Sequence, residues 1–499
     1  MISVAETLEK ERLNHVFEVD GHRKEVLGQY FTPYSIARFM SSLFPVTEDN
    51  IKLLDPGAGI GTLSCSFLER IVKENWNTPK IRVVAYDIDK NVQNILEQNL
   101  ALASSPLHKS EYEIFSEDFL EKTSLDYMWK INETFTHVIM NPPYKKISIK
   151  SKERYASRTF GLETVNLYAA FMGAAISLTE DRGHIVAIVP RSFCNGVYYK
   201  PFREFILRNC AIKHIHLFES RNQAFKDESV LQENIIIMLK KNSLQENVKI
   251  TYCTDETFSD LTDFNVPFSQ ILHENDTEKY FYIPTKQQIE IKNMNQDSTL
   301  ADLNIQVSTG PIVDFRHKEL LRKNFEEHTI PIIYAVHLKN HRLSWPQDSK
   351  KPNAIVDSEV IRKQQFPKGF YVLVKRFSTK EERKRIIASI ITPDDFIGDS
   401  MTFENHLNIF HVNKNSLPEY LAYGLVCWLN STNIDDRFRL FSGHTQVNAT
   451  DLRNLPYPDT EKLTKLGTAA VPSGSFTRLS IIPAVCTIRR ALEDYLICY

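Results

Sequence analysis

Residues 141–144, Asn-Pro-Pro-Tyr, have the side chains needed to hold a planar substrate that carries an amino group. The two prolines fix their own φ angles and have no N–H to donate. The Asn141 side chain and the Pro142 carbonyl can therefore both act as rigid hydrogen-bond acceptors, while Tyr144 offers a flat face for stacking. An ordinary Pro-Pro turn is the weaker alternative, because the motif directly follows the strand-like run 135–140.

A glycine-rich loop at 55–61, Asp-Pro-Gly-Ala-Gly-Ile-Gly, could bring a ligand close to the backbone. Gly57, Gly59 and Gly61 permit a tight turn between a strand and a helix, and Asp55 stands at the end of that strand. The loop contains no Gly-Lys-Ser/Thr sequence, which excludes a P-loop for phosphates. A plain strand-to-helix turn stays open as the alternative.

Acidic residues follow the next two strand-like runs. Asp87 suits hydrogen bonding to ribose hydroxyls, whereas Asp89 suits a cap for the helix that starts near Lys90. Further on, Asp118 beside Phe119 could bind an adenine amino group and pack on its ring. Taken alone, this last pair is indistinguishable from a loop acid beside a core aromatic.

The elements that must position these residues alternate between strand-like and helix-like patterns. Such alternation predicts a mostly parallel α/β sheet with helices on both faces, and ligands bind at the carboxyl ends of strands in such folds. The motifs above all fall at such ends. The strand-like runs are 51–55, 81–87, 112–115, 135–140, 184–189, 213–218 and 234–239, and the helix-like stretches are 33–44, 62–74, 90–103, 162–178 and 201–208.

The alternating pattern fades after residue 241, so we expect residues 1–241 to form the first domain. Residues 242–282 are polar and carry turn signals, which predicts a linker. Residues 283–460 show short apolar runs separated by proline, asparagine and charge, which indicates a second, mixed α+β domain. Residues 461–499 form a tail to which no motif assigns a role.

Composition narrows the class of protein. The chain has 499 residues, with 60 basic and 62 acidic side chains and a formal net charge of -2, which excludes a uniformly basic coat but not a local basic face. Its 7 cysteines are odd in number and none has Cys-x-x-Cys spacing, which argues against a disulfide framework and the usual zinc sites. We find no signal peptide and no apolar run long enough for a membrane span, and we expect a cytoplasmic protein.

The motifs together resemble those of S-adenosylmethionine-dependent DNA adenine-N6 methyltransferases. The chain carries Gln-Tyr-Phe-Thr-Pro at 29–33, then the glycine loop, Asp87, Asp118-Phe119 and Asn-Pro-Pro-Tyr, which is the motif order of the γ group. The match covers about residues 28–241. It is most similar to the PstI-like subgroup of type II restriction–modification enzymes. The resemblance implies a Rossmann-like S-adenosylmethionine-dependent methyltransferase sheet, followed by a target-recognition domain.

On the cofactor side, the resemblance implies contacts at both ends of S-adenosylmethionine. The glycine loop and the residues just before the first helix surround its methionine end. Two acids bind its ribose and adenine, and two apolar side chains pack on the adenine ring. The implied cofactor residues are Phe31, Thr32, Asp55, Gly57, Gly59, Gly61, Asp87, Ile88, Asp118 and Phe119.

On the substrate side, the resemblance implies that Asn141 and Pro142 accept hydrogen bonds from the target N6 and that Tyr144 stacks on the flipped base. A second stacking aromatic is expected upstream of the seventh strand, where Phe225 is the best match. The methyl group is transferred by direct in-line displacement, which requires neither a covalent enzyme intermediate nor a metal. The target base must leave the duplex stack, at a cost of a few kcal/mol.

Candidate DNA contacts lie in the second domain, because a base-specific enzyme must hold phosphates and read base edges. The segment 375–385 holds six basic residues against two acids, although a solvated charged face is an equal alternative. The polar block 441–456 resembles the end of the recognition domain in type II adenine methyltransferases. The candidate residues are Lys375, Arg376, Lys380, Arg383, Lys384, Arg385, His444 and Gln446.

The sequence therefore predicts a site-specific methyltransferase of double-stranded DNA that protects its sites from a separate cognate restriction endonuclease. We expect a monomer that works in the bacterial cytoplasm, in contact with the nucleoid. One alternative is a protein-glutamine methyltransferase, since a planar amide fits the same motif. The large second domain and the motif at 29–33 argue against it. The other is a catalytically silent DNA-specificity protein, against which the complete motif set argues.

Overall fold

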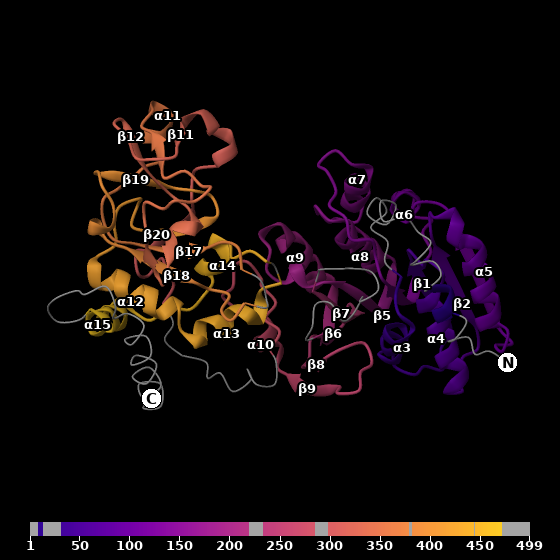
Figure 1. The fold of residues 1–499 in the computed structure, drawn as a ribbon. Helices are drawn as coiled ribbons and strands as arrows, with labels where there is room; N and C mark the ends of the chain where they lie inside the picture. The colour runs from indigo at the N-terminus through magenta and orange to yellow at the C-terminus, as the bar shows by residue number, and fades with distance from the viewer. Residues whose placement is uncertain are drawn as a thin grey trace. The chain divides into compact units, whose positions relative to one another are not determined.

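The computed structural model of the protein describes residues 8–12, 31–218, 233–284, 298–378, 382–443 and 445–471. The chain divides into two compact units, residues 1–286 and 287–499 (Figure 1).

Unit 1 is built on a nine-stranded sheet whose strand order is β3-β2-β1-β4-β5-β7-β6-β8-β9. The five strands from β3 to β5 pair in parallel, and β7 runs antiparallel between β5 and β6. The predicted mostly parallel sheet is thus confirmed. Its strands are β1 (Ile51–Pro56), β2 (Ile81–Tyr86), β3 (Ser110–Phe115), β4 (Phe135–Met140), β5 (Thr179–Pro190), β6 (Cys210–Phe218), β7 (Asn234–Lys241), β8 (Val248–Cys253) and β9 (Thr262–Val266).

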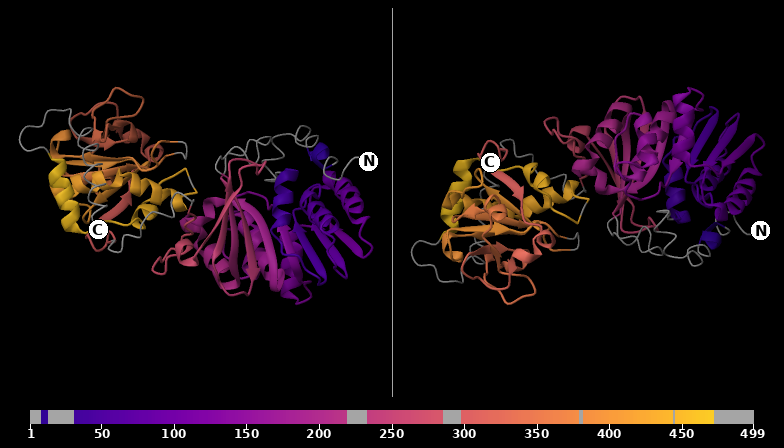
Figure 2. Two further views of the ribbon diagram at one scale, coloured as in Figure 1. Left: turned by 90° about the horizontal axis from the view of Figure 1, so that it is seen from below. Right: turned by 90° about the horizontal axis from the view of Figure 1, so that it is seen from above.

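Helices cover both faces of this sheet (Figure 2). The helices α3 (Tyr34–Ser42), α4 (Thr62–Lys73) and α5 (Lys90–Ser104) pack on one face, against alternate side chains of β1, β2 and β4. The opposite face is covered by α6 (Phe119–Met128), α7 (Lys152–Thr159), α8 (Leu167–Leu178) and α9 (Lys200–Asn209). Among the described residues no helix, including the apolar α8, is long and apolar enough to cross a membrane.

The range 242–282, which we expected to be a linker, differs in the structure. It carries β8, which pairs with β6, then β9, which pairs with β8, and the short helix α10 (Phe268–Ile271). The strands lie at the end of the sheet, and exposed residues alternate with buried or half-buried ones along β9. Because half of such a strand is solvated, its sequence is polar enough to read as a loop.

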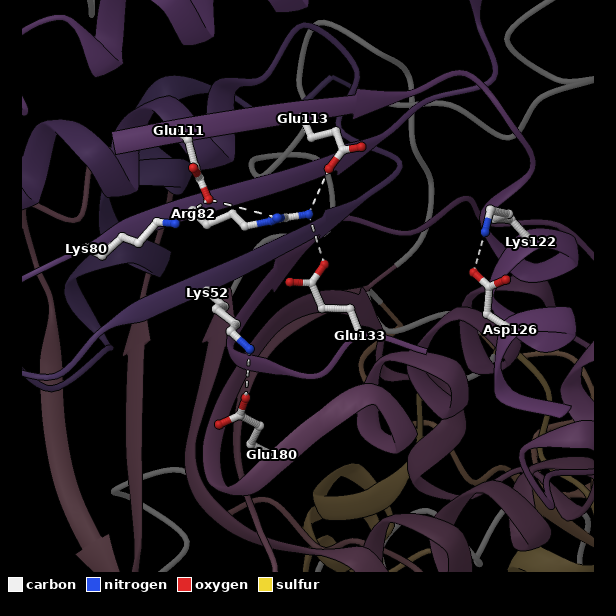
Figure 3. A network of polar contacts seen from close by, with 9 residues as sticks. All are labelled: Lys52, Lys80, Arg82, Glu111, Glu113, Lys122, Asp126, Glu133 and Glu180. Atoms are coloured by element: carbon white, nitrogen blue, oxygen red, sulfur yellow. Dashed lines mark hydrogen bonds and ion pairs between the residues drawn. The ribbon is translucent and has the colours of Figure 1, made fainter. Parts of the chain in front are cut away.

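Charged residues form ion pairs at the amino end of the sheet (Figure 3). Arg82 of β2 contacts Glu113 at 2.8 Å and Glu133 at 3.2 Å, and Lys52 of β1 lies 3.6 Å from Glu180 of β5. Each of these exposed or half-buried pairs contributes little to the stability of the fold. Acidic and basic side chains are thus mixed at the amino edge, unlike the acid-rich carboxyl edge described below.

Unit 2 contains two sheets and several helices, in agreement with the mixed α+β content expected there. The six-stranded sheet has the order β10-β20-β17-β18-β14-β13, and the five-stranded sheet has the order β11-β15-β12-β19-β16. The first comprises β10 (Gln306–Thr309), β20 (Leu407–His411), β17 (Tyr371–Lys375), β18 (Ala388–Ile391), β14 (Arg342–Leu343) and β13 (Leu338–Lys339). The second comprises β11 (Leu321–Arg322), β15 (Ala354–Val356), β12 (Thr329–Ile333), β19 (Ser400–Phe403) and β16 (Phe366–Pro367). The helices are α11 (Glu359–Arg362), α12 (Glu419–Leu429), α13 (Thr432–Phe441), α14 (Ala449–Arg453) and α15 (Thr460–Ala470).

The start of the expected tail belongs to unit 2. Helix α15 packs on α12 through two glycines that bring the backbones together. A Cβ added to Gly424 would lie 1.8 Å from the Leu463 carbonyl oxygen, and one on Gly467 would lie 1.8 Å from the Tyr420 carbonyl oxygen. Any side chain at either glycine would therefore separate the helices. Residues 472–499 lie outside the described part of the chain.

Candidate active site

A cavity of about 270 Å³ lies in unit 1, where β1, β2 and β4 end. The sheet topology explains its location, because neighbouring parallel strands end on the same edge. Most of the predicted cofactor-binding and catalytic residues line it, whereas Asp55, Gly61, Pro142 and Tyr144 do not. The predicted residues in its wall are Phe31, Thr32, Gly57, Gly59, Asp87, Ile88, Asp118, Phe119 and Asn141.

The glycine loop after β1 folds tightly under the cavity. The N–H groups of Gly57 and Ala58 both donate to the Tyr86 carbonyl at 2.8 Å, which ties the loop to the end of β2. Gly59 has φ +57°, and a Cβ there would approach the Phe31 ring to 3.3 Å. A larger residue would thus push Phe31 out of its buried position beside Ile60. The loop ends where α4 begins, so the first helical residues also line the cavity.

Asp55 is fully buried behind the glycine loop. Its Oδ2 atom accepts from the Ser64 hydroxyl at 2.6 Å, while its Oδ1 atom has no hydrogen-bond partner among the described residues. Burial raises the pKa of this carboxyl to about 7. A buried oxygen that lacks a donor is costly, and a donor supplied by a ligand would offset that cost.

Asp87 joins the two loops that form the wall of the cavity. Its Oδ2 atom accepts from the Gly59 N–H at 2.7 Å and its Oδ1 atom from the Asp89 N–H at 2.8 Å, and burial raises the pKa of this carboxyl to about 6. The next side chain, Ile88, is apolar yet 52% exposed at the cavity. Asp89 caps α5 by accepting from the Asn91 N–H at 3.0 Å, so the capping prediction for Asp89 is confirmed.

Asp118 and Phe119 serve the fold and also reach the cavity. The Asp118 side chain caps α6 by accepting from the Glu121 N–H at 3.1 Å, and Lys152 lies 3.5 Å from its other oxygen. The Phe119 ring is buried between those of Tyr86 and Phe171. The structure thus shows the cap and the core aromatic, and both residues also line the cavity, while their contact with an adenine stays a prediction.

The Asn-Pro-Pro-Tyr turn follows β4 directly and brings three polar side chains together. Asn141 Nδ2 donates to Thr32 Oγ1 at 3.1 Å, and the Tyr144 hydroxyl donates to Asn141 Oδ1 at 2.9 Å. The Tyr144 hydroxyl also lies 3.1 Å from the Ile188 carbonyl of β5. The turn is thus connected both to the residues before α3 and to the neighbouring strand.

Comparison with known proteins identifies the family. The model for Eco57I restriction-modification methylases matches residues 34–225. Type II methyltransferase M.BsuBI of Bacillus subtilis is 44% identical over 478 residues, which cover 94% of each chain. Type II methyltransferase M.PstI of Providencia stuartii is 38% identical over 93% of each chain. The chain belongs to the type II methyltransferases. It is thus a DNA methyltransferase of the restriction–modification type.

Among solved structures, the type IIG restriction endonuclease BpuSI is similar to this type II methyltransferase with a TM-score of 0.48 and 16% identity. The match covers 98% of this chain and 67% of that one. The type IIL enzyme MmeI, solved in complex with DNA, gives a TM-score of 0.49 and 11% identity, over 98% of this chain and 74% of that one.

Several residues in the cavity wall of the methyltransferase were not predicted. Lys145 directly follows the Asn-Pro-Pro-Tyr turn, and its place in the sequence could have flagged it. Leu167 and Phe171 come from α8, which sequence alone does not place beside β4. The Leu167 N–H donates to the Lys145 carbonyl at 2.8 Å, a long-range contact that joins the helix to the turn.

Other predicted residues fall outside the described part of the methyltransferase. Phe225, the expected second stacking residue, lies outside it, as do Gln29 and Tyr30 of the first motif. Two candidate DNA-binding residues, Lys380 and His444, do so as well.

The remaining basic residues of the segment 375–385 do not share one face. Arg383 is exposed and Lys375 half-buried, whereas the Lys384 ammonium donates to the Asn430 carbonyl. Arg385 is only 2% exposed, and its guanidinium lies 5.2 Å from the centre of the Phe438 ring. The expectation that Arg385 contacts DNA is contradicted by this burial. Its charged head is held inside unit 2 instead of facing solvent.

Arg376 and Gln446 do come together. The Arg376 guanidinium donates to the Asn405 carbonyl at 2.9 Å and to Gln446 Oε1 at 3.3 Å. Two exposed rings stand next to them, since Phe377 is 54% exposed and its ring centre lies 5.2 Å from that of His406. The two predicted segments 375–385 and 441–456 therefore meet at this point, although only some of their residues take part.

Proposed function

We propose that this type II methyltransferase transfers a methyl group from S-adenosylmethionine to the N6 atom of adenine in duplex DNA. The observation that carries the proposal is that Asn141 lines the same cavity as Asp87, Ile88 and Phe119. Asn141 can accept from an exocyclic amino group, and the other three side chains suit the ribose and the flat ring of a nucleoside. The cofactor would bring the nucleoside, and the target adenine would bring the amino group.

The residues of the cavity fit S-adenosylmethionine. The Asp87 oxygens each accept one backbone hydrogen bond and keep a lone pair for ribose hydroxyls. Exposed Ile88 would be covered by the adenine ring, and Phe119 lies in the same wall. Phe31, Thr32 and the glycine loop would surround the methionine end, with Asp55 buried behind that loop. When bound, the cofactor supplies an electrophilic methyl group on a sulfonium.

The protein's own part is to orient the amino group. The adenine N6 lone pair is delocalised into the ring and is a poor nucleophile. Asn141 Oδ1 and the Pro142 carbonyl would accept both N6 hydrogens, which returns electron density to nitrogen and aims it at the methyl group. Tyr144 would stack on the base, and proximity supplies most of the rate enhancement. Because N6 is hidden in the duplex, the base would be flipped out first.

DNA would be held partly by unit 2, at the surface formed by Arg376, Phe377, His406 and Gln446. The Gln446 amide and the His406 imidazole can hydrogen-bond to base edges, while Phe377 offers an exposed ring. Arg376 links the segments that carry them. Lys375, Arg383 and Lys384 have the charge to contact phosphates from the neighbouring segment, and Lys380 and His444 continue the same two stretches of sequence.

In the cell, methylation at one short sequence would protect the DNA from a separate cognate restriction endonuclease. The relatives' type II classification supports this role. The enzyme would work in the cytoplasm as a monomer and methylate one strand of its site at a time.

The proposal is tested by incubating the protein with methyl-labelled S-adenosylmethionine and duplex DNA, followed by digestion to nucleosides. Label in N6-methyladenine is expected. Label confined to a protein substrate would favour the protein-glutamine alternative, and label in a cytosine derivative would reject adenine as the target. Cofactor binding without any transfer would favour a silent specificity protein.

A further inference from the structure

The segment 145–152, which directly follows the Asn-Pro-Pro-Tyr turn, carries four lysines and no acid. It leaves the wall of the cavity at Lys145 and returns to it before Glu153, since both of these residues line the cavity. The short stretch between them therefore stays near the cavity. Lys146 and Lys150 in this stretch are exposed, and positive charge beside a cavity that would hold a nucleotide of DNA suits phosphate groups.

The protein holds both ends of this segment in place. At the first end, the Ile147 N–H donates to the Val165 carbonyl at 2.9 Å, and the Ile147 side chain packs in the core of unit 1. At the other end, the Ser151 hydroxyl accepts from the Arg154 N–H at 3.3 Å and caps α7. The Ser151 N–H donates to the Ser148 carbonyl at 3.2 Å, which closes a turn over residues 148–151. A turn held in this way loses little further conformational freedom when it binds a partner.

Ile149 stands inside this turn, between a serine and a lysine. Its side chain is 68% exposed. Because most of the side chain stays in water, the fold gains little stability from it. A flipped adenine leaves a gap in the base stack, and proteins that unstack DNA insert apolar side chains, isoleucine among them, between bases. An exposed isoleucine flanked by lysines, next to the proposed site for the flipped base, has the chemistry for that role.

We propose that the segment 146–151 is a DNA contact of unit 1, in which Ile149 fills the gap left by the flipped adenine and Lys146 and Lys150 contact the neighbouring phosphates. Filling the gap restores part of the lost stacking and so favours the state in which the adenine occupies the cavity. This inference rests on the proposed adenine-N6 transfer. It adds a contact in unit 1 to the DNA contacts proposed for unit 2.

The connection between α6 and β4 offers a matched control. Ile131 is 71% exposed, and Lys130 beside it is exposed as well. This pair has the same residue types as Ile149 and Lys150 and a similar exposure. It precedes β4 and therefore lies at the amino edge of the sheet, away from the residues that line the cavity.

The role of Ile149 is tested by the single-turnover rate of methyl transfer, with saturating enzyme and S-adenosylmethionine. Two duplexes carry the sequence that the wild type methylates, one with the target adenine paired to thymine and one with it opposite a mismatched cytosine. Relative to wild type, Ile149→Ala should lower the rate about tenfold on the paired duplex but less than about threefold on the mismatched one, because a mismatched base costs less to flip. Ile149→Leu keeps an apolar side chain and should retain most of the rate on both.

Controls separate this role from a structural one. Ile131→Ala should leave both rates unchanged, and Ile149→Ala should melt at the wild-type temperature and bind S-adenosylmethionine within about threefold of wild type. If Ile149→Ala melts lower, Ile149→Thr, which keeps the branched shape, replaces it with the same expectations. A loss of the same size on both duplexes, or no loss on either, would overturn the proposal.

The two lysines are tested by fluorescence anisotropy with duplex DNA at several salt concentrations. Replacing both Lys146 and Lys150 by glutamine removes two phosphate contacts, so the plot of log affinity against log salt should become shallower by about two. Lys130→Gln should leave the slope unchanged. An unchanged slope in the double variant would also overturn the proposal. Wild-type enzyme that makes no N6-methyladenine would reject the proposed function instead.

Discussion

The carboxyl edge of the sheet in unit 1 and the basic segment of unit 2 were both predicted from short stretches of sequence, with different outcomes. At the sheet edge, Asp87, Asp118 and Asn141 each follow a strand and all reach one cavity. In the segment 375–385, Arg383 is exposed while Arg385 is buried. A motif that directly follows a strand is placed by the sheet. No element of the fold places a run of charged residues in the same way.

The largest effect is expected for Asn141→Ala, which removes an acceptor of the sheet edge. Methyl transfer should fall by at least about 100- to 1,000-fold, the range seen when one positioned polar group is removed from an active site. Cofactor affinity, measured by calorimetry, should stay within about threefold, because Asn141 is proposed to act on the substrate. Asn94→Ala, at an exposed position of α5, is the matched control and should leave both quantities unchanged. Substantial transfer by Asn141→Ala would mean that another group accepts from N6.

Two variants test whether buried and exposed arginines of the basic segment differ in their effect on stability. Arg385→Ala should lower the free energy of unfolding by about 2–4 kcal/mol, because a buried side chain packed on Phe438 is lost. Arg383→Ala, two positions away and exposed, should change it by less than about 0.5 kcal/mol. Chemical denaturation of the two variants measures the difference. Equal effects would show that the segment is one solvated face after all.

Asp87→Asn tests whether Asp87 binds the cofactor ribose in the cavity. The affinity for S-adenosylmethionine should fall about tenfold, since an amide accepts weaker hydrogen bonds than a carboxylate. Because burial raises the pKa of Asp87 to about 6, the carboxylate is charged above that pH and neutral below it. Wild-type affinity should therefore fall as the pH drops through about 6, and the part of this change that comes from Asp87 should vanish in Asp87→Asn. Titration calorimetry across this range would contradict the ribose role if both proteins gave the same curve.

The smallest effect is expected at the exposed surface of unit 2. Gln446→Ala and Phe377→Ala should each weaken binding to duplex DNA about fivefold, as for the loss of one base contact. Ile397→Ala is a control, because Ile397 is 65% exposed and stands outside both predicted DNA-binding segments. Fluorescence anisotropy at fixed salt is the measurement. Normal affinity in both variants would place the DNA contacts of unit 2 elsewhere.

Features that depend on one segment of the chain could be predicted from the sequence, whereas features that depend on contacts between distant segments could not. The Ile- and Val-rich runs marked β5 and β7, because strands covered on both faces must be apolar throughout. The half-solvated edge strand β9 carries no such signal, and the sequence predicts a linker for the range that holds β8 and β9. The contact between Gly424 and α15 could not be predicted either, because it depends on how two helices pack in the folded chain.

The same reasoning applies inside the candidate site. Asp87 and Asn141 could be predicted because each directly follows a strand, and the fold places the ends of these strands together. Leu167 and Phe171 could not, because α8 reaches the cavity only through its packing on the sheet. The bond between Thr32 and Asn141 joins residues far apart in the sequence, and only the folded chain brings them within 3.1 Å.

The central claim is that this type II methyltransferase modifies adenine N6 at one DNA sequence through Asn141. The most direct measurement is a genome-wide map of modified bases in a bacterium that lacks other methyltransferases and expresses either the wild-type protein or Asn141→Ala. The account predicts N6-methyladenine at nearly every copy of one short sequence with the wild type, and none with the variant. Modified cytosine at that sequence, or N6-methyladenine that persists in Asn141→Ala, would contradict it.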